Sequence, residues 1–197
     1  MNSTWLDQGL RDGELLAGWL RETERATGIV TRLIDRLSSA LSAGQRVLTC
    51  GNGGSMSDAI HFAQELSGRF RKDRPAFAAQ AMSDPAHLTC VANDFGFDQV
   101  FARGVEAWGR SGDVLVALST SGSSPNVVNA ADAARLRGLT VIGLLGRDGG
   151  ALLPRCDDAV VVPSQDSGRV QEIHIKLIHL MIEGIERRLV PQNYAGQ

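Results

Sequence analysis

The chain has 197 residues, of which 43% are hydrophobic and 21% are charged, and its formal net charge is −2. This length fits one sizeable domain, and the composition is that of a soluble globular protein with enough apolar material for a core. The nearly neutral net charge argues against general electrostatic binding to nucleic acid or anionic lipid, because both interactions need clustered positive charge.

The cysteines and the N-terminal region indicate the compartment. Cys50, Cys90 and Cys156 lie far apart and form no CxxC pair, which argues against a zinc knuckle or a dithiol redox motif. Asp7 and Asp12 come early, without the basic and apolar segments of a secretory signal. No apolar stretch approaches the ~20 residues needed to cross a bilayer. We therefore expect a reduced, soluble, cytoplasmic protein that does not bind membranes.

The first forty or so residues have the spacing of two amphipathic helices. The first apolar stripe comprises Leu6, Leu10, Leu16, Trp19 and Leu20. The second stripe comprises Val30, Leu33, Ile34, Leu37 and Leu41. Gly44 stands where a glycine usually closes a helix. Since these helices (residues 1–43) precede every strand, we expect them to pack on the later sheet or on a partner subunit.

From residue 46 onward, short apolar runs alternate with helical segments. The runs cover residues 46–50, 77–82, 114–118, 140–145 and 159–162. The helical segments cover residues 56–69, 125–137 and 169–189. This alternation indicates buried parallel strands joined by helices. We predict an α/β fold in which residues 1–197 form a single domain, with a five-stranded parallel sheet in an α/β core (44–190) and a frayed tail (191–197).

The first loop with unusual chemistry is Cys50-Gly-Asn-Gly-Gly-Ser55, between a predicted strand and a predicted helix. Glycines allow a sharp turn and close approach of a ligand, and free amides at a helix start suit an anionic group. A tight turn without any ligand explains the glycines equally well. Neither a GxGxxG fingerprint nor a P-loop is present, so the nucleotide signatures are excluded.

The second loop is Ser119-Thr-Ser-Gly-Ser-Ser124, which precedes a helix beginning at Pro125. Proline is favoured in the first helical turn, and Ser124 is suited to the N-cap. Capping needs one hydroxyl, whereas this loop has five, which favours a neutral phosphate cradle at the helix N-terminus over an ordinary turn. No lysine is needed, which fits one monophosphate bound without Mg²⁺.

Two predicted helices carry candidates for acid–base chemistry. His61 and Glu65 lie four residues apart on one helical face. Gln171 and His179 lie eight residues apart, about 80° beyond two full turns, so both can face one cavity. These side chains could transfer protons at neutral pH, or bind zinc, or merely make surface contacts. The basic run at residues 69–74 is interpreted first as a solvated helix end and second as a local anion contact.

Several motifs together resemble the phosphoheptose isomerases, the sedoheptulose 7-phosphate isomerases of the sugar-isomerase (SIS) fold. They are Cys50-Gly-Asn-Gly-Gly-Ser55, Asp58-Ala-Ile-His-Phe-Ala63 with Glu65, Gly68-Arg69, Asn93-Asp-Phe-Gly-Phe97, Ser119-Thr-Ser-Gly122, Gly146-Arg-Asp-Gly-Gly150, and Gln171-Glu-Ile-His174 with His179. The resemblance covers nearly the whole chain, although residues 162–169 differ and put fine substrate preference in question.

The resemblance implies an enediol reaction that converts sedoheptulose 7-phosphate to D-glycero-D-manno-heptose 7-phosphate, the first step towards the heptose units of bacterial surface polysaccharide. It assigns Glu65 as base at one carbon and His179 as acid–base partner at the other. The implied phosphate ligands are Ser119, Thr120, Ser121 and Ser124. The implied sugar contacts are Asn52, Gly53, Gly54, Asn93, Asp94 and Gln171, with Ser55 and Arg69 as further contacts.

The resemblance also implies a homotetramer with active sites at subunit interfaces, and zinc held by His61, Glu65, Gln171 and His179. A zinc-bound carboxylate is a poorer base, so we expect zinc to order the site, or to move during turnover, and not to carry the proton. Two alternatives remain. One is a non-catalytic relative that binds a partner such as the bacterial replication initiator, and the other is an isomerase of a different sugar phosphate. The presence of all four acid–base candidates favours the enzyme.

Overall fold

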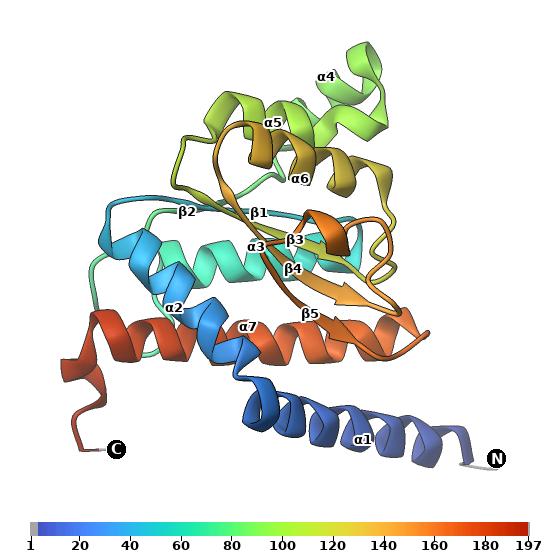
Figure 1. Ribbon diagram of the computed structural model, residues 1–197, viewed down its shortest axis with the longest axis vertical. Coiled ribbons are helices and arrows are strands. Elements are labelled where there is room, and N and C mark those ends of the chain that lie inside the picture. Colours follow the sequence, from blue (N-terminus) through green and yellow to red (C-terminus); the bar gives the residue numbers. More distant parts are fainter. Residues whose placement is uncertain (1–3, 197) are drawn as a thin grey trace.

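Five parallel strands in the order β2-β1-β3-β4-β5 form the centre of the molecule in the computed structural model, which describes residues 4–196 (Figure 1). The strands are β1 (Val47–Cys50), β2 (Ala79–Ala81), β3 (Val114–Ser119), β4 (Thr140–Gly146) and β5 (Asp158–Val162). Every residue of β3 is buried, because helices cover both faces of the sheet. The predicted α/β class and five-stranded parallel sheet are confirmed.

Helices form a layer on each side of this sheet (Figure 1). One layer contains α2 (Ile29–Ser42), α3 (Gly54–Ser67) and α7 (Ser167–Leu189), and its core includes Phe62 and Leu177. The other layer contains α4 (Pro85–Phe95), α5 (Val100–Trp108) and α6 (Pro125–Leu136), and its core includes Phe101. The domain therefore has two separate hydrophobic cores, divided by the sheet.

Helices α4 and α5 were not predicted from the sequence. The start signal of α4 was present, because Asp84 accepts a hydrogen bond from the His87 amide at 2.7 Å and Pro85 occupies the first turn. Both helices are short, with 11 and 9 residues. Short amphipathic segments give few repeats of the helical period, so their pattern is weak.

The first helix, α1 (Thr4–Thr27), lies along α7 at the edge of the molecule (Figure 1). Leu16, Trp19 and Leu20 pack against the core, and Arg169 of α7 donates to the Gly9 carbonyl oxygen at 2.8 Å. Other apolar side chains of α1 remain exposed, namely Trp5, Leu6, Leu10 and Leu15. The predicted stripe is thus only partly buried within one chain.

The prediction of a frayed tail is wrong for residues 191–194. A turn of 3₁₀ helix at Pro191–Tyr194 returns the chain to α7, where the Tyr194 hydroxyl donates to Glu186 at 2.7 Å. The buried tyrosine ring also lies under the Arg187 guanidinium. Within residues 4–196, no helix combines the length and the apolar character that spanning a bilayer requires.

His174 is a fully buried histidine on α7 with a structural contact. Its Nε2 donates to the Leu145 carbonyl oxygen at 3.2 Å, and its Nδ1 has no hydrogen-bond partner among the described residues. Burial lowers the pKa of His174 to about 4, against the opposing effect of the hydrogen bond to Leu145. The imidazole is therefore neutral in the folded protein at neutral pH.

This low pKa predicts acid sensitivity of the fold. The unfolded chain binds a proton at His174 below a pH of about 6.5 and the folded chain only below about 4, so His174 costs stability as the pH falls through that window. His174→Gln removes the titration. Relative to the variant, the wild type should lose about 2 kcal/mol between pH 7 and pH 4.5, measured by urea unfolding. A constant difference would contradict the prediction.

Candidate functional site

The loops after β1 and β3 flank the point where the strand order reverses. In the order β2-β1-β3-β4-β5, the chain leaves β1 for α3 on one face and β3 for α6 on the other. The two loops diverge there at the carboxyl ends of the strands, which is where open α/β sheets bind ligands. We call residues 50–55 the glycine loop and residues 119–124 the serine loop.

The glycine loop turns directly into α3, which begins at Gly54 and not at residue 56 as predicted. Gly53 has φ +54°, in the left-handed region that favours glycine. A Cβ atom added at Gly54 would lie 2.5 Å from the Gln171 Nε2, so glycine is required for Gln171 of α7 to reach this loop. Ser55 is buried beneath Gly51 in the first turn of α3.

Two asparagines tie the glycine loop to the helix that follows the serine loop. The Asn52 side chain donates to Asn126 Oδ1 at 2.8 Å, and the Asn126 side chain donates back to Asn52 Oδ1 at 2.9 Å. Asn126 is buried in the first turn of α6. Asn52 was predicted as a site residue, whereas Asn126 was missed, although an asparagine directly after Pro125 at a helix start is a usable signal.

The serine loop is held by its own hydroxyl groups. Ser119 Oγ lies 3.3 Å from Ser124 Oγ and accepts from the Gly122 amide at 3.1 Å. Ser121 Oγ accepts from the Ser123 amide at 3.2 Å. Ser124 occupies the predicted N-cap position of α6, but its side chain makes no capping hydrogen bond there. The hydroxyls thus gather at the entrance of α6.

The turn at residues 146–150 packs directly against the serine loop. An added Cβ at Gly122 would overlap the Gly149 carbonyl oxygen, and one at Gly150 would overlap Ser123 Oγ. Gly122, Gly149 and Gly150 also have positive φ angles of 64°, 84° and 49°. Backbone therefore packs directly on backbone, which is a physical reason for the glycines of this motif.

The start of α7 reaches the serine loop. Thr120 Oγ1 donates to Ser167 Oγ at 3.1 Å. Ser167 belongs to the divergent segment 162–169, so this segment lies beside the serine loop. Asp166 caps α7 by accepting from the Gly168 amide at 2.7 Å and the Arg169 amide at 3.3 Å.

The acid–base candidates meet where α3 lies against α7. His61 Nε2 is 3.1 Å from His179 Nε2 and 3.7 Å from Glu65 Oε1. Glu65 Oε1 accepts from Gln64 Nε2 at 2.6 Å, and Glu65 Oε2 is buried without a hydrogen-bond partner among the described residues. Glu65 and His179, from distant parts of the sequence, are thus both within reach of His61.

These distances bear on metal binding. A zinc tetrahedron with metal–nitrogen bonds near 2.1 Å has edges of about 3.4 Å, close to both separations measured from His61. Within residues 4–196, however, no group of three or more His, Cys, Asp and Glu side chains is gathered closely enough to hold a metal. Zinc binding would therefore require a change in the relative positions of His61, Glu65 and His179.

Asp58 lies one turn before His61 on α3 and was not assigned a role from the sequence. Burial raises the pKa of its carboxyl to about 6, while His61 acts to lower it. Asp58 Oδ2 is also buried without a partner among the described residues. The spacing of Asp58, His61 and Glu65 along one helical face was the signal that could have revealed it.

A large cavity opens beside this cluster. It has a volume of about 760 Å³ and lies between α1 and α7, with His179, Phe70 and Glu172 in its wall. The His179 ring stacks on Phe70, with ring centroids 5.9 Å apart and an interplanar angle of 23°. The apolar face of Phe70 thus fixes the orientation of His179.

The basic run at residues 69–74 divides into exposed and buried members. Arg69 is exposed just beyond α3, and Arg71 pairs with Glu183 of α7 at 2.8 Å. Arg74 is fully buried against Glu186, with an Nε to Oε1 distance of 2.7 Å. The interpretation as a solvated helix end is wrong for Arg74, because its guanidinium is an internal structural group.

The structure does not bring Asn93 and Asp94 to this cluster within one chain. Both are exposed on α4, in the layer on the opposite side of the sheet from α3 and α7 (Figure 1). The Asn93 side chain donates to Asp94 Oδ1 at 2.7 Å. Their predicted role at the sugar therefore has no support from the geometry of a single chain.

Comparison with known proteins identifies relatives along nearly the whole chain. A model of the SIS domain family matches residues 16–146. The phosphoheptose isomerase of Fusobacterium nucleatum is 48% identical over 184 residues, which span 93% of this chain and 94% of that protein. Solved phosphoheptose isomerases from Neisseria gonorrhoeae (38% identity, TM-score 0.85, covering 93% of this chain and 98% of that one) and Francisella tularensis (34%, 0.86, 95% and 100%) have the same fold. The chain therefore belongs to the SIS-domain family and, within it, to the phosphoheptose isomerases.

Proposed function

We propose that this chain converts sedoheptulose 7-phosphate to D-glycero-D-manno-heptose 7-phosphate, in the biosynthesis of bacterial heptose. One observation carries the proposal: a single helix, α7, borders every part of the candidate site. Its Ser167 contacts the serine loop, its Gln171 lies against the glycine loop and its His179 faces His61. A sugar whose phosphate lies at the serine loop would thus extend along α7 towards the acid–base groups.

In the proposed mechanism, Glu65 removes a proton from C1 of the open-chain ketose. Its Oε2 is shielded from water and receives no donor from the described residues, so a lone pair is available. His179 acts as the acid that donates a proton to C2 of the enediol, and Phe70 packs against its ring. The hydroxyl proton passes from O1 to O2, and proton exchange with solvent then restores Glu65 and His179. The hydroxyls and amides of the serine loop bind the phosphate with the aid of the α6 dipole. The phosphate thereby anchors the sugar in one orientation during both proton transfers.

We further propose that zinc binds His61, Glu65, Gln171 and His179. When bound, zinc would polarise the oxygen atoms of the sugar. The distances from His61 Nε2 to His179 Nε2 and to Glu65 Oε1 support such a site. Glu65 Oε1 would be the ligand atom, and Oε2 would remain for the proton transfer. Because a metal lowers the basicity of a bound carboxylate, we assign zinc to the ordering of these side chains and leave the proton transfer to Glu65 and His179.

We also propose a cytoplasmic homotetramer with active sites between subunits. The exposed apolar side chains of α1 need a partner surface, since contiguous apolar patches on a soluble protein mark interaction sites. A neighbouring subunit would also explain how Asn93 and Asp94, distant from Glu65 within one chain, could reach a sugar. The net charge of −2 gives no support to nucleic-acid binding.

The decisive experiment supplies purified protein with sedoheptulose 7-phosphate and follows heptose 7-phosphate by NMR. Fructose 6-phosphate and ribulose 5-phosphate serve as competing substrates, and each assay is repeated after chelation and after addition of zinc. We expect turnover of the heptulose phosphate, which chelation reduces and zinc restores. Preference for a shorter sugar would replace the proposed substrate. A lack of turnover on all three would favour a non-catalytic relative, and full activity without metal would remove zinc from the proposal.

A further inference from the structure

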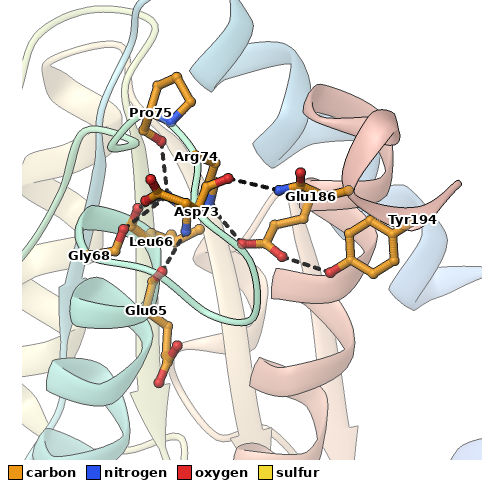
Figure 2. Close-up of polar contacts among 9 residues, drawn as sticks. Glu65, Leu66, Gly68, Asp73, Arg74, Pro75, Glu186 and Tyr194 are labelled. Atoms are coloured by element: carbon orange, nitrogen blue, oxygen red, sulfur yellow. Dashed lines mark hydrogen bonds and ion pairs between the residues drawn. The ribbon is translucent and has the colours of Figure 1, made fainter.

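Arg74 is the centre of a buried polar network that joins the end of α3 to α7 (Figure 2). The side chains of Arg74 and Glu186 are both 0% exposed. A buried ion pair is expensive, because the cost of removing two charges from water offsets most of their attraction. Such a pair contributes little net stability compared with apolar side chains of the same size, so another role is worth seeking.

The rest of the guanidinium binds backbone carbonyls in and just beyond the last turn of α3. Its Nη2 donates to the backbone carbonyl oxygen of Glu65 at 2.6 Å. Its Nη1 donates to the backbone carbonyl oxygens of Leu66 at 2.9 Å and Gly68 at 3.3 Å. The last carbonyls of a helix lack partners within the helix and favour positive charge. A left-handed glycine often closes a helix, but Gly68 has φ −91° and ψ −112°. Arg74 therefore caps α3 in its place.

Glu186 makes this cap a connection between helices. Its Oε1 accepts from Arg74, and its Oε2 accepts from the Tyr194 hydroxyl at 2.7 Å, so both oxygens are satisfied (Figure 2). Burial, together with the hydrogen bond to Glu186, raises the pKa of Tyr194 to about 12, which keeps the hydroxyl a donor at neutral pH. Glu186 lies about two helical turns beyond His179 on α7.

We infer that Arg74 is a positioning residue that sets Glu65 against His179, an inference that rests on the proposed function. Glu65 lies in the last turn of α3, where helices fray. Apolar packing between α3 and α7 is non-directional and tolerates small shifts. The planar fork of Arg74, in contrast, holds the Glu65 backbone and Glu186 in fixed directions. Arg74 thus fixes the position of the Glu65 backbone relative to α7.

The cleanest test is the double variant Arg74→Met/Glu186→Met, because it removes both charges together. Paired replacement by apolar side chains usually leaves a protein folded. We expect kcat for sedoheptulose 7-phosphate to fall by about 10- to 100-fold, because small misplacement of a catalytic group has effects of this size. KM should change by less than about threefold, because the serine loop lies outside this network. Hydrogen exchange at residues 65–68 should become faster, while that of α6 stays unchanged.

Two further variants and one control complete the test. Arg74→Lys keeps the charge but cannot span Glu186 and the carbonyls, so kcat and exchange should show a smaller change in the same direction. Tyr194→Phe leaves one Glu186 oxygen unpaired and should also speed exchange at the end of α3. Arg46→Met breaks another ion pair with a buried carboxylate, Asp113, which lies at the amino ends of the strands, and should leave kcat unchanged.

The outcomes separate this inference from the proposed function. Unaltered exchange at residues 65–68 and a wild-type kcat in folded double or Arg74→Lys variants would overturn the role of Arg74. A comparable loss of kcat in Arg46→Met would reduce the effect to general stability and would also overturn it. If the wild type has no isomerase activity, the proposed function fails, and the exchange measurement alone decides whether Arg74 orders the end of α3.

Discussion

Glu65→Gln should lower kcat by about 1,000-fold, the middle of the range for loss of a general base. The amide keeps the size of the side chain and can still accept from Gln64, but it cannot take a proton from C1. KM should change little, because the serine loop that anchors the phosphate is untouched. Steady-state kinetics with sedoheptulose 7-phosphate measure both constants, and thermal unfolding confirms that the variant is folded.

His179→Ala provides the matching test at the second carbon, and Glu106→Gln provides the control. Glu106 is an exposed glutamate paired with Arg103 on α5, so its amide should leave kcat unchanged. If Glu65→Gln retains more than a tenth of wild-type kcat, Glu65 is not the base. In that case Asp58, whose pKa is raised to about 6 by burial, becomes the next carboxyl to replace.

Gly122→Ala is expected to disrupt the serine loop and raise KM for the sugar phosphate by more than about tenfold. The added Cβ would overlap the Gly149 carbonyl oxygen, so the loop or the supporting turn must move, and the residue also has φ +64°. Loss of one or two hydrogen bonds to a phosphate, at about 1.5–3 kcal/mol for each charged contact, gives a change of this size. Kinetics and calorimetric titration with inorganic phosphate report the effect.

Gly44→Ala is the control that separates the effect of backbone strain from the effect of steric overlap at Gly122. Gly44 has φ +77°, and an added Cβ would meet no atom within 4 Å. This variant should lose about 1–2 kcal/mol of stability from strain and keep its KM. If Gly122→Ala behaves like Gly44→Ala, the close packing of the serine loop on the turn at residues 146–150 does not govern phosphate binding.

The core of the fold could be predicted because buried parallel strands must be apolar on both faces. The runs around β3 and β4 therefore indicated strands without ambiguity, and their ends were correct to within one residue. Helices α4 and α5 escaped prediction because each offers few helical repeats. The tail also escaped, because the burial of Tyr194 depends on Glu186, a partner that local pattern does not reveal.

The candidate site was predictable where its chemistry is local. The serine loop and the glycine loop could be found because glycines and hydroxyls between a strand and a helix are a local pattern. Arg74 was misinterpreted, because a charged residue in a basic run suggests solvent, whereas its partners lie in α3 and 112 residues further along the chain. Asn126 was missed for the same reason, since its role depends on contact with Asn52.

The divergence of the two loops at the carboxyl ends of the strands has a thermodynamic consequence. The glycine loop is continuous with the layer of α3 and α7, and the serine loop is continuous with the layer of α6. The paired amides of Asn52 and Asn126, like the hydrogen bond from Thr120 to Ser167, therefore connect two helix layers on opposite faces of the sheet. A ligand that contacts both loops would couple the unfolding of the two helix layers. Occupancy should therefore sharpen the cooperativity of unfolding as well as delay it.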